Sequence, residues 1–177
     1  MGMKQDRLSS RKWVEAGLSA LVKQGPSALR AEPLARALGT TKGSFYWHFA
    51  DVPAFHTAVL DHWQAQAFAD IVSALEKPGS AADRLRVFGA LVLKDSAGAA
   101  IRAWAQGHTG AANSIAQVDA QRLQYVQTLL ASVGVTTADF TLAAYGSLIG
   151  MPHVPGHNRA EAEGAYASLV DLVLALR

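Results

Sequence analysis

The residues best suited to chemistry lie in one short segment of the sequence. It contains a lysine, a serine, two aromatic residues and a histidine. They are Lys42, Ser44, Tyr46, Trp47 and His48. The phenol, the indole N–H and the imidazole can donate hydrogen bonds to phosphate oxygens, while the lysine and serine can reach base edges. Gly43 leaves room for a close approach of the backbone. The segment therefore predicts contact with a nucleic acid.

A sharp connection between two short predicted helices would position this segment. Helical patterns cover residues 32–38 and 42–48, and Gly39-Thr40-Thr41 separates them. A three- or four-residue connection that contains glycine sets two helices at a steep angle, as in a helix-turn-helix. A threonine hydroxyl at this point would cap the second helix. The alternative interpretation is that the aromatic side chains are partly core and wedged against neighbouring helices.

Positive charge is concentrated at the same end of the chain. The whole sequence has a formal net charge of +2, but residues 1–52 hold eight Lys or Arg residues against four acidic ones. The remainder is mildly acidic. A basic N-terminal third favours an anionic partner for that end, although an imbalance of this size also arises by chance.

The composition favours a helical fold with a substantial core. Of the 177 residues, 50% are hydrophobic and 17% are charged, which is too little charge for a disordered chain. Alanine, the strongest helix former, is unusually frequent. The absence of cysteine excludes disulfides, thiol nucleophiles and cysteine-based metal sites. Because the sequence has neither a long apolar run nor a signal-like N-terminus, we expect a cytoplasmic protein.

Helical periodicity continues to the end of the chain, and no stretch alternates long enough to predict a strand. After Asp51 a long helix is expected that ends at Lys77-Pro78-Gly79. Together with it, the predicted helices cover residues 8–24, 32–38, 42–48, 81–95, 99–106, 112–133, 138–151 and 159–176. The expected fold class is all-α, with about nine helices.

Residues 18–60, and especially the stretch LARALGTTKGSFYWHF at residues 34–49, resemble the N-terminal DNA-binding domain of TetR-family transcriptional repressors. That family joins a three-helix head to a larger helical body, which dimerises and usually holds a small-molecule pocket. The resemblance implies a helix-turn-helix DNA-binding domain over residues 1–51 and a six-helix ligand-binding and dimerisation domain over residues 52–177. It also implies a repressor that binds a palindromic operator as a dimer and is released by a small molecule.

The resemblance assigns roles to individual residues. It makes Lys42 and Gly43 base readers. It also implies that five further residues contact phosphates or the groove, namely Thr41, Ser44, Tyr46, Trp47 and His48. Two positions depart from the family: Glu32 stands where an Arg or Thr is frequent, and Val52 stands where a Lys is usual. We expect Arg30 to supply the phosphate contact instead, with weaker binding or a shallower salt dependence than in a typical member.

Aromatic and polar residues beyond residue 51 could line a pocket for a small organic molecule, which needs an apolar wall with a few polar groups. The candidates are His62, Trp63, Gln66, Phe88, Trp104, His108, Arg122 and Tyr125. For each aromatic residue, an ordinary place in the core is the alternative. Arg122 lies beside an apolar stripe and needs a partner if it is buried. We expect an ion pair with Asp119, three residues earlier, rather than an acidic ligand.

The last two predicted helices have the pattern of a helix-bundle interface. Gly146 and Gly150 lie about one turn apart, so that another helix could approach closely. In the final helix, apolar residues follow a 4-3-4-3 spacing, and they are Ala162, Tyr166, Leu169, Val173 and Leu176. In the TetR family the last two helices of each chain form a four-helix dimer interface, so the resemblance implies a homodimer through these residues. Alternatively, the chain covers this surface with its own helices.

Other signals for chemistry are weak. His153 and His157, in MPHVPGHN, lack the nearby carboxylates or cysteines of a metal site. No Ser-His-Asp, paired-glutamate or phosphate-loop constellation is present. We therefore expect no enzyme activity, no cofactor and no metal. The expected partners are a double-stranded DNA operator, a small-molecule effector and a second copy of the chain, with no membrane.

Two rival functions remain open. The first is a helical small-molecule-binding protein with impaired DNA binding, for which Glu32 and Val52 would be the marks. The second is an enzyme in a helical bundle that uses His62 or His108 as a base. Salt-dependent DNA binding separates the first rival from the main hypothesis, and turnover would be needed for the second.

Overall fold

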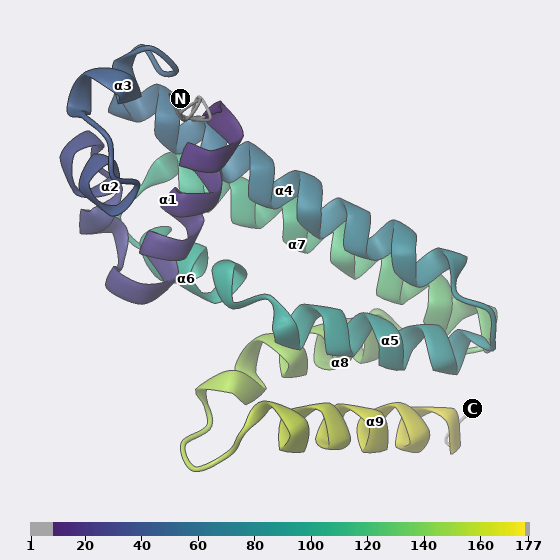
Figure 1. Ribbon diagram of the computed structural model, residues 1–177. Coiled ribbons are helices and arrows are strands. Elements are labelled where there is room, and N and C mark those ends of the chain that lie inside the picture. The colour runs from purple at the N-terminus through teal and green to yellow at the C-terminus, as the bar shows by residue number, and fades with distance from the viewer. Residues whose placement is uncertain (1–8, 176–177) are drawn as a thin grey trace, which may run out of the picture. The chain divides into compact units, whose positions relative to one another are not determined.

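The computed structural model describes residues 9–175, and all regular elements in that range are helical (Figure 1). The α-helices are α1 (Ser10–Gln24), α2 (Ala31–Ala37), α3 (Lys42–Tyr46), α4 (Val52–Glu76), α5 (Ala81–Lys94), α6 (Ser96–Trp104), α7 (Thr109–Ser132), α8 (Ala138–Gly150) and α9 (Arg159–Ala175). Two short 3-10 turns, η1 (Pro26–Ala28) and η2 (Met151–His153), accompany them. The predicted all-α class is confirmed.

Most helix ends lie within a residue or two of the predicted ones, whereas α6 and α7 each begin three residues earlier. Helix α3 ends at Tyr46 rather than at residue 48, so that Trp47 and His48 lie in the following turn. Helix α7 begins three residues earlier than predicted. The Nδ1 atom of His108 accepts a hydrogen bond from the backbone N–H of Ala111 at 3.1 Å, which caps this end. A histidine is not among the usual N-cap residues, so the sequence pattern missed it.

Backbone contacts divide the described residues into two compact units. The first holds residues up to Gln64 together with Ala97–Ile115, and the second holds Ala65–Ser96 and the residues from Ala116 onward. Helices α4 and α7 therefore contribute to both units. The first unit groups the helix-turn-helix with the start of α4 and with most of α6.

An aromatic cluster forms the core around α3 in the first unit. The ring centroid of Phe45 lies 5.4 Å from that of Trp13 in α1 and 5.2 Å from that of Phe55 in α4. Phe49 completes the cluster at 4.9 Å from Phe55. Trp13, Phe45 and Phe55 are fully buried, and such edge-to-face aromatic pairs add to the stabilisation from burial. Phe45 thus fastens the five-residue helix α3 to the core of the first unit.

Gly17 allows α1 to pack directly against α4. A Cβ atom at this position would lie 2.6 Å from Cζ of Phe55 and 3.1 Å from Cγ2 of Val59. Both distances are shorter than an ordinary van der Waals contact, so the two helices could not keep this spacing with a larger residue. The glycine therefore helps to fix the helix that carries Trp13.

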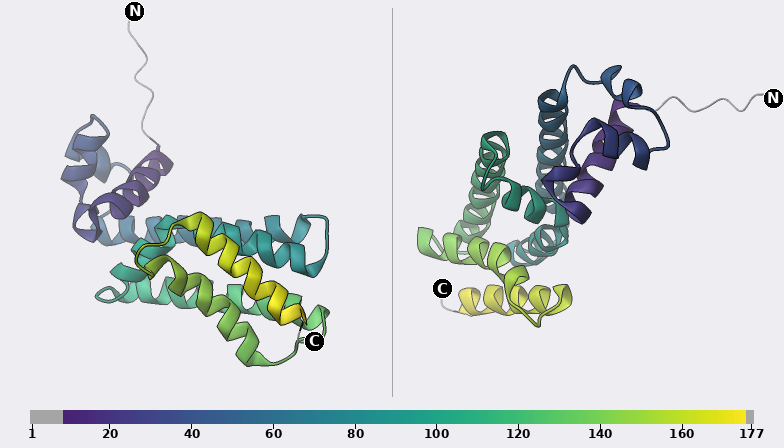
Figure 2. Two further views of the ribbon diagram at one scale, coloured as in Figure 1. Left: turned by 90° about the horizontal axis from the view of Figure 1, so that it is seen from below. Right: turned by 90° about the vertical axis from the view of Figure 1, so that its left-hand side faces the viewer.

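The second unit has its core between the C-terminal part of α4 and helices α5, α7, α8 and α9, and α8 contacts α9 (Figure 2). Gly89 of α5 lies against the ring of Tyr166 in α9, where a Cβ atom would come within 2.3 Å of the ring. An ion pair between Arg86 and Asp171 also joins these two helices. Helix α9 is thus packed closely on α5 of its own chain.

Candidate nucleic-acid interface

Helix α3 and the turn after it combine a fixed interior side with an exposed polar and aromatic side. The hydroxyl of Thr41 accepts a hydrogen bond from the backbone N–H of Ser44 at 3.4 Å and so caps the helix. Phe45 is buried, whereas Tyr46 is 48% exposed and Trp47 is 86% exposed. A tryptophan exposed to this degree is unusual, because large aromatic side chains are normally well buried. Exposed aromatic groups on a short, anchored element indicate a binding surface.

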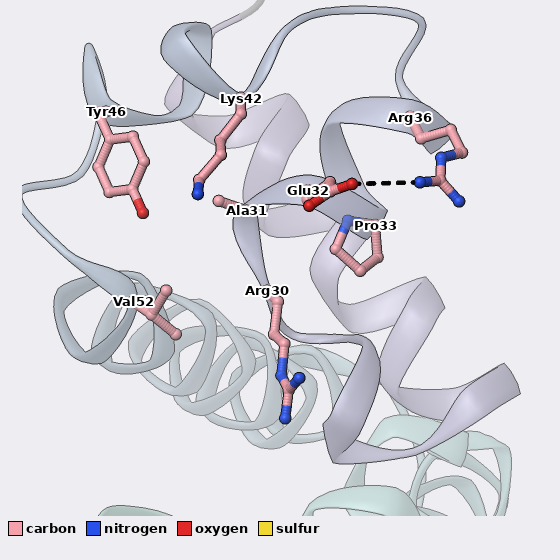
Figure 3. Close-up of a pocket in the computed structure, with 8 residues that line it drawn as sticks. All are labelled: Arg30, Ala31, Glu32, Pro33, Arg36, Lys42, Tyr46 and Val52. Carbon is pink, nitrogen blue, oxygen red and sulfur yellow. Dashed lines mark hydrogen bonds and ion pairs between the residues drawn. The ribbon is translucent and has the colours of Figure 1, made fainter.

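A hollow of about 480 Å³ lies next to this surface, between the start of α2, α3 and the start of α4 (Figure 3). Its lining includes three cationic side chains, Arg30, Arg36 and Lys42, and one acidic one, Glu32. The side chains of Lys42 and Tyr46 both extend from the α3 side into the same space. An excess of cations around an open hollow suits an anion such as a phosphate group.

Glu32 does not face the hollow as an isolated negative charge. Its carboxylate accepts a hydrogen bond from the Arg36 guanidinium at 3.3 Å, one turn further along α2 (Figure 3). Both side chains are well exposed, so this ion pair adds little to stability. It does place a positive charge beside the one acidic residue in the lining of the hollow. Arg36 is the residue that the sequence analysis missed, although its i,i+4 spacing from Glu32 gave a signal.

The eight residues predicted to contact DNA lie together at the start of α2 and along α3. Arg30, Lys42 and Tyr46 line the hollow, and Val52 occupies the α4 side of it. The remaining ones are either exposed or half-buried on α3 and its flanks, and they are Thr41, Gly43, Ser44, Trp47 and His48. A Cβ atom at Gly43 would meet only the Thr41 hydroxyl, at 3.7 Å, so its backbone is open to an approaching partner.

The residues predicted to line an effector pocket do not form one group. In the first unit, the rings of Trp104 and His108 have centroids 4.2 Å apart and planes tilted by 34°, Trp63 is fully buried and His62 is half-buried. In the second unit, Phe88 and Tyr125 pack edge to face at 5.0 Å and Gln66 is exposed. Neither the hollow beside α3 nor a smaller one of about 210 Å³ near η2 is lined by any of them.

Arg122 is buried, and its ion-pair partner comes from a distant part of the sequence. Its guanidinium lies 3.0 Å from the carboxylate of Asp95, which follows α5. Asp119, the partner expected from the spacing, accepts a hydrogen bond from the Tyr145 hydroxyl at 2.6 Å. Burial, followed by the nearby charge of Asp95, raises the pKa of the Asp70 carboxyl. Buried charges that are paired in this way are costly to separate.

Two of the predicted dimer contacts on α9 are covered by their own chain. Tyr166 is 1% exposed and Val173 is 5% exposed, because both pack into the core of their own chain. Leu169 is half-buried against the same core, and Leu176 lies outside the described residues. The 4-3-4-3 spacing identified a packing stripe, but α5 of the same chain covers it.

The predicted small residues of α8 are exposed. Gly146 and Gly150 have open space where a Cβ atom would lie. The neighbouring Leu142 is 64% exposed, and Leu172 on the outer side of α9 is 57% exposed. An apolar surface on the second unit therefore remains uncovered, at positions beside those expected.

A family model described as bacterial regulatory proteins, tetR family, matches residues 14–51. The matched segment extends from Val14 of α1 through α2 and α3 to Asp51. It contains all eight residues predicted to contact DNA. No curated protein sequence matches the chain.

Solved structures share the fold over nearly the whole chain. A putative TetR-family regulator from Rhodococcus sp. has a TM-score of 0.73 at 19% identity and covers 93% of this chain and 97% of its own. A TetR-family regulator from Streptomyces coelicolor has a TM-score of 0.74 at 15% identity, with 99% and 96% covered. A putative regulator from Saccharomonospora viridis, solved with choline, has a TM-score of 0.75 at 14% identity. It covers 92% of this chain and 95% of its own.

Residues 14–51 thus match the tetR family model, and the chain shares its fold with solved TetR-family regulators. The resemblance drawn from residues 34–49 is thereby confirmed. In the part of the chain that the structure describes, no helix is long and apolar enough to cross a membrane. Residues 9–175 also contain no group of three or more side chains placed to hold a metal ion.

Proposed function

We propose that this regulator binds a palindromic DNA operator as a homodimer, acts as a repressor and is released by a small molecule. The observation that supports this function best is the exposed side of α3, where Tyr46 and Trp47 stand beside a hollow with three cationic side chains. Residues 1–51 form the DNA-binding domain in this proposal and residues 52–177 the effector and dimer domain. Its place of action is the cytoplasm, where bacterial DNA lies.

The first test is to select DNA from a random duplex pool with the purified protein and to titrate the selected duplex against salt. A palindromic sequence with steep salt dependence is expected, because each phosphate contact releases counterions. Failure to enrich any sequence at low salt, with protein that is shown to be folded, contradicts the proposal. It would favour the rival in which a helical small-molecule-binding protein has impaired DNA binding.

A charge-matched pair of variants tests whether the hollow contacts phosphates. Lys42→Ala removes a cation from its lining, whereas Lys23→Ala removes an exposed cation from the end of α1. We expect only Lys42→Ala to lower the slope of log affinity against log salt, by about one. Equal slopes for both variants would mean that the hollow does not contact the DNA backbone.

The dimer surface proposed here is the exposed face of α8 and α9 around Gly146, Gly150 and Leu172. The exposed leucine on α9 and the two glycines of α8, which have room for another helix, support it. Leu172→Lys is expected to give monomers in sedimentation. Val22→Lys, at a 41% exposed position on α1, is the matched control and should leave the dimer intact. Dimeric Leu172→Lys would place the interface elsewhere.

The effector part of the proposal rests on the predicted pocket residues and on the family. One structural neighbour was solved with choline, so choline is the first compound to test. An effector is expected to raise the melting temperature by mass action and to weaken binding of the selected duplex. A compound that raises the melting temperature without any loss of DNA affinity would show ligand binding without regulation.

A further inference from the structure

A histidine on α4 is hydrogen-bonded to the backbone immediately before α2. The Nε2 atom of His56 lies 3.0 Å from the carbonyl oxygen of Leu29. Because a carbonyl oxygen can only accept, Nε2 must carry the hydrogen, which fixes the tautomer of the neutral ring. Leu29 is fully buried, and the next residue, Arg30, is the N-cap of α2 and lines the hollow beside α3.

Two rings, one from the last residue of α6 and one from the residue before α7, hold this histidine in place. The centroid of the His56 ring lies 5.0 Å from that of Trp104 and 5.5 Å from that of His108, and both contacts are edge to face. His108 is fixed in turn by the hydrogen bond that its Nδ1 accepts from the N–H of Ala111. All these residues belong to the first compact unit.

The environment of His56 favours its neutral form. The pKa of His56 is lowered, and desolvation by burial is the largest cause. The hydrogen bond to Leu29 raises this pKa in part, and the nearby His108 lowers it further. The neutral ring presents one donor to Leu29 and leaves Nδ1 without a proton. His56 is therefore a neutral, oriented link between two segments that are far apart in the sequence.

We propose that His56 is a positioning residue for DNA binding: through the carbonyl of Leu29 it sets Arg30 at the hollow, and Trp104 and His108 hold it in that position. The inference rests on the proposed function, because it needs Arg30 to contact DNA. It goes further in making the connection between α6 and α7 a determinant of DNA affinity. A displacement of that connection would be transmitted to the start of α2 through the side chain of His56.

The rival explanation is that His56 only adds stability to the first unit. The two explanations differ in how a change at His56 combines with a change at Arg30. If His56 acts by placing Arg30, removing Arg30 makes the loss of His56 irrelevant for DNA affinity. If His56 acts on stability alone, the two changes have independent effects, and their free-energy changes add.

The test uses the full-length protein and the palindromic duplex selected by the wild-type chain. His56→Leu removes the donor, whereas His56→Gln keeps an N–H donor at a similar reach. Thr57→Val is the matched control, because it removes a hydrogen bond to the backbone of α4 itself, from Thr57 Oγ1 to the Pro53 carbonyl at 3.2 Å. Melting temperatures of all variants check that each is folded.

We expect His56→Leu to weaken duplex binding roughly three- to tenfold and to lower the salt slope by about one, as Arg30→Ala does. His56→Gln should restore most of the affinity, and Thr57→Val should leave it unchanged. In the double variant with Arg30→Ala, His56→Leu should cause little further loss. Additive losses, or an unchanged salt slope in His56→Leu, would overturn the proposal.

A second pair of variants tests the role of His108 without removing the cap of α7. His108→Asn keeps a side-chain acceptor for the N–H of Ala111 but removes the ring beside His56. His108→Ala removes both. Duplex affinity should fall in both variants while the melting temperature falls mainly in His108→Ala. Wild-type affinity in a folded His108→Asn would show that the ring contact does not matter.

These outcomes separate the inference from the function on which it rests. If the wild-type chain selects no duplex, the proposed function fails before any variant is made. If the wild-type chain binds and Arg30→Ala lowers the affinity, the function stands whatever the His56 variants do. If the wild-type chain binds and the affinity losses of His56→Leu and Arg30→Ala add in the double variant, only the positioning role of His56 is contradicted.

Discussion

The turn after α3 and the helix α9 both carry apolar or aromatic residues that sequence analysis assigned to an intermolecular surface, but the structure treats them differently. Trp47 after α3 is 86% exposed. Tyr166 of α9 is 1% exposed, because its ring lies on Gly89 of the same chain. A large aromatic side chain is therefore exposed to solvent after α3, whereas on α9 it is buried in the core.

The difference arises from the length of the helices and from what packs against them. Helix α3 has five residues, and Phe45 alone fastens it to the aromatic cluster. Helix α9 has 17 residues and can cover α5 on one side while a second side stays open. A periodic apolar stripe thus predicts that a helix face will be covered, but it does not say by which chain.

The largest expected effect is a difference in stability between substitutions of Phe45 and of Trp47, which lie two residues apart in the sequence. Phe45→Ala is expected to lower the free energy of unfolding by about 3–5 kcal/mol, because it empties the centre of the aromatic cluster. Trp47→Ala should change it by no more than about 0.5 kcal/mol. Guanidinium unfolding measures both. Comparable losses would show that Trp47 is part of the core.

The next effect concerns the contact that holds α9. Gly89→Ala places a Cβ atom against the Tyr166 ring and should cost about 1–3 kcal/mol of stability. Gly164→Ala is the control, because a Cβ atom would meet open space at this exposed position of α9 and the change should gain about 0.5–1 kcal/mol. Thermal unfolding at one protein concentration compares the two. A neutral Gly89→Ala would mean that α9 is not tightly packed on α5.

A smaller effect is expected from removing one hydroxyl from the exposed side of α3. Tyr46→Phe should weaken binding of the selected duplex roughly threefold to tenfold, because it deletes one hydrogen-bond donor near the hollow. The fold should keep its melting temperature, since Tyr46 is half exposed. Fluorescence anisotropy with a labelled duplex makes the measurement. Unchanged affinity would confine the DNA contacts to the cationic residues.

The smallest expected effect is a pH dependence of stability that comes from the first unit. The folded-state pKa of His56 is lowered, so the unfolded chain takes up the proton first as the pH falls. The free energy of unfolding should therefore decline as the pH drops below about 6.5, the ordinary pKa of histidine. His56→Gln should flatten this decline. An unchanged profile in that variant would assign the dependence to another group.

Much of the helical fold could be predicted from the sequence because its breaks are marked locally. Gly25-Pro26 ends α1, and Gly39 follows α2, the first helix of the helix-turn-helix, where it adopts a φ of 64° that favours glycine. Tyr46, Trp47 and Lys42 could be identified as surface residues because Phe45 and Phe49 supply the inward side of the same segment. These signals act over a few residues.

The remaining features depend on contacts between distant parts of the sequence. The partner of Arg122 is Asp95, 27 residues away, and the partner of His56 is the Leu29 carbonyl, also 27 residues away. The cover of α9 is α5, which no periodicity could specify. Arg36 had a local signal in its spacing from Glu32, but its place at the hollow depends on how α2 meets α3.

The contrast in exposure among the four tryptophans gives the protein two optical populations. Trp13, Trp63 and Trp104 are between 0% and 7% exposed, and their indoles should emit at short wavelengths and resist iodide. Trp47 should supply the long-wavelength emission and be open to collisional quenching. Quenching at the red edge of the spectrum would thus report on the surface beside α3 alone, without any attached label.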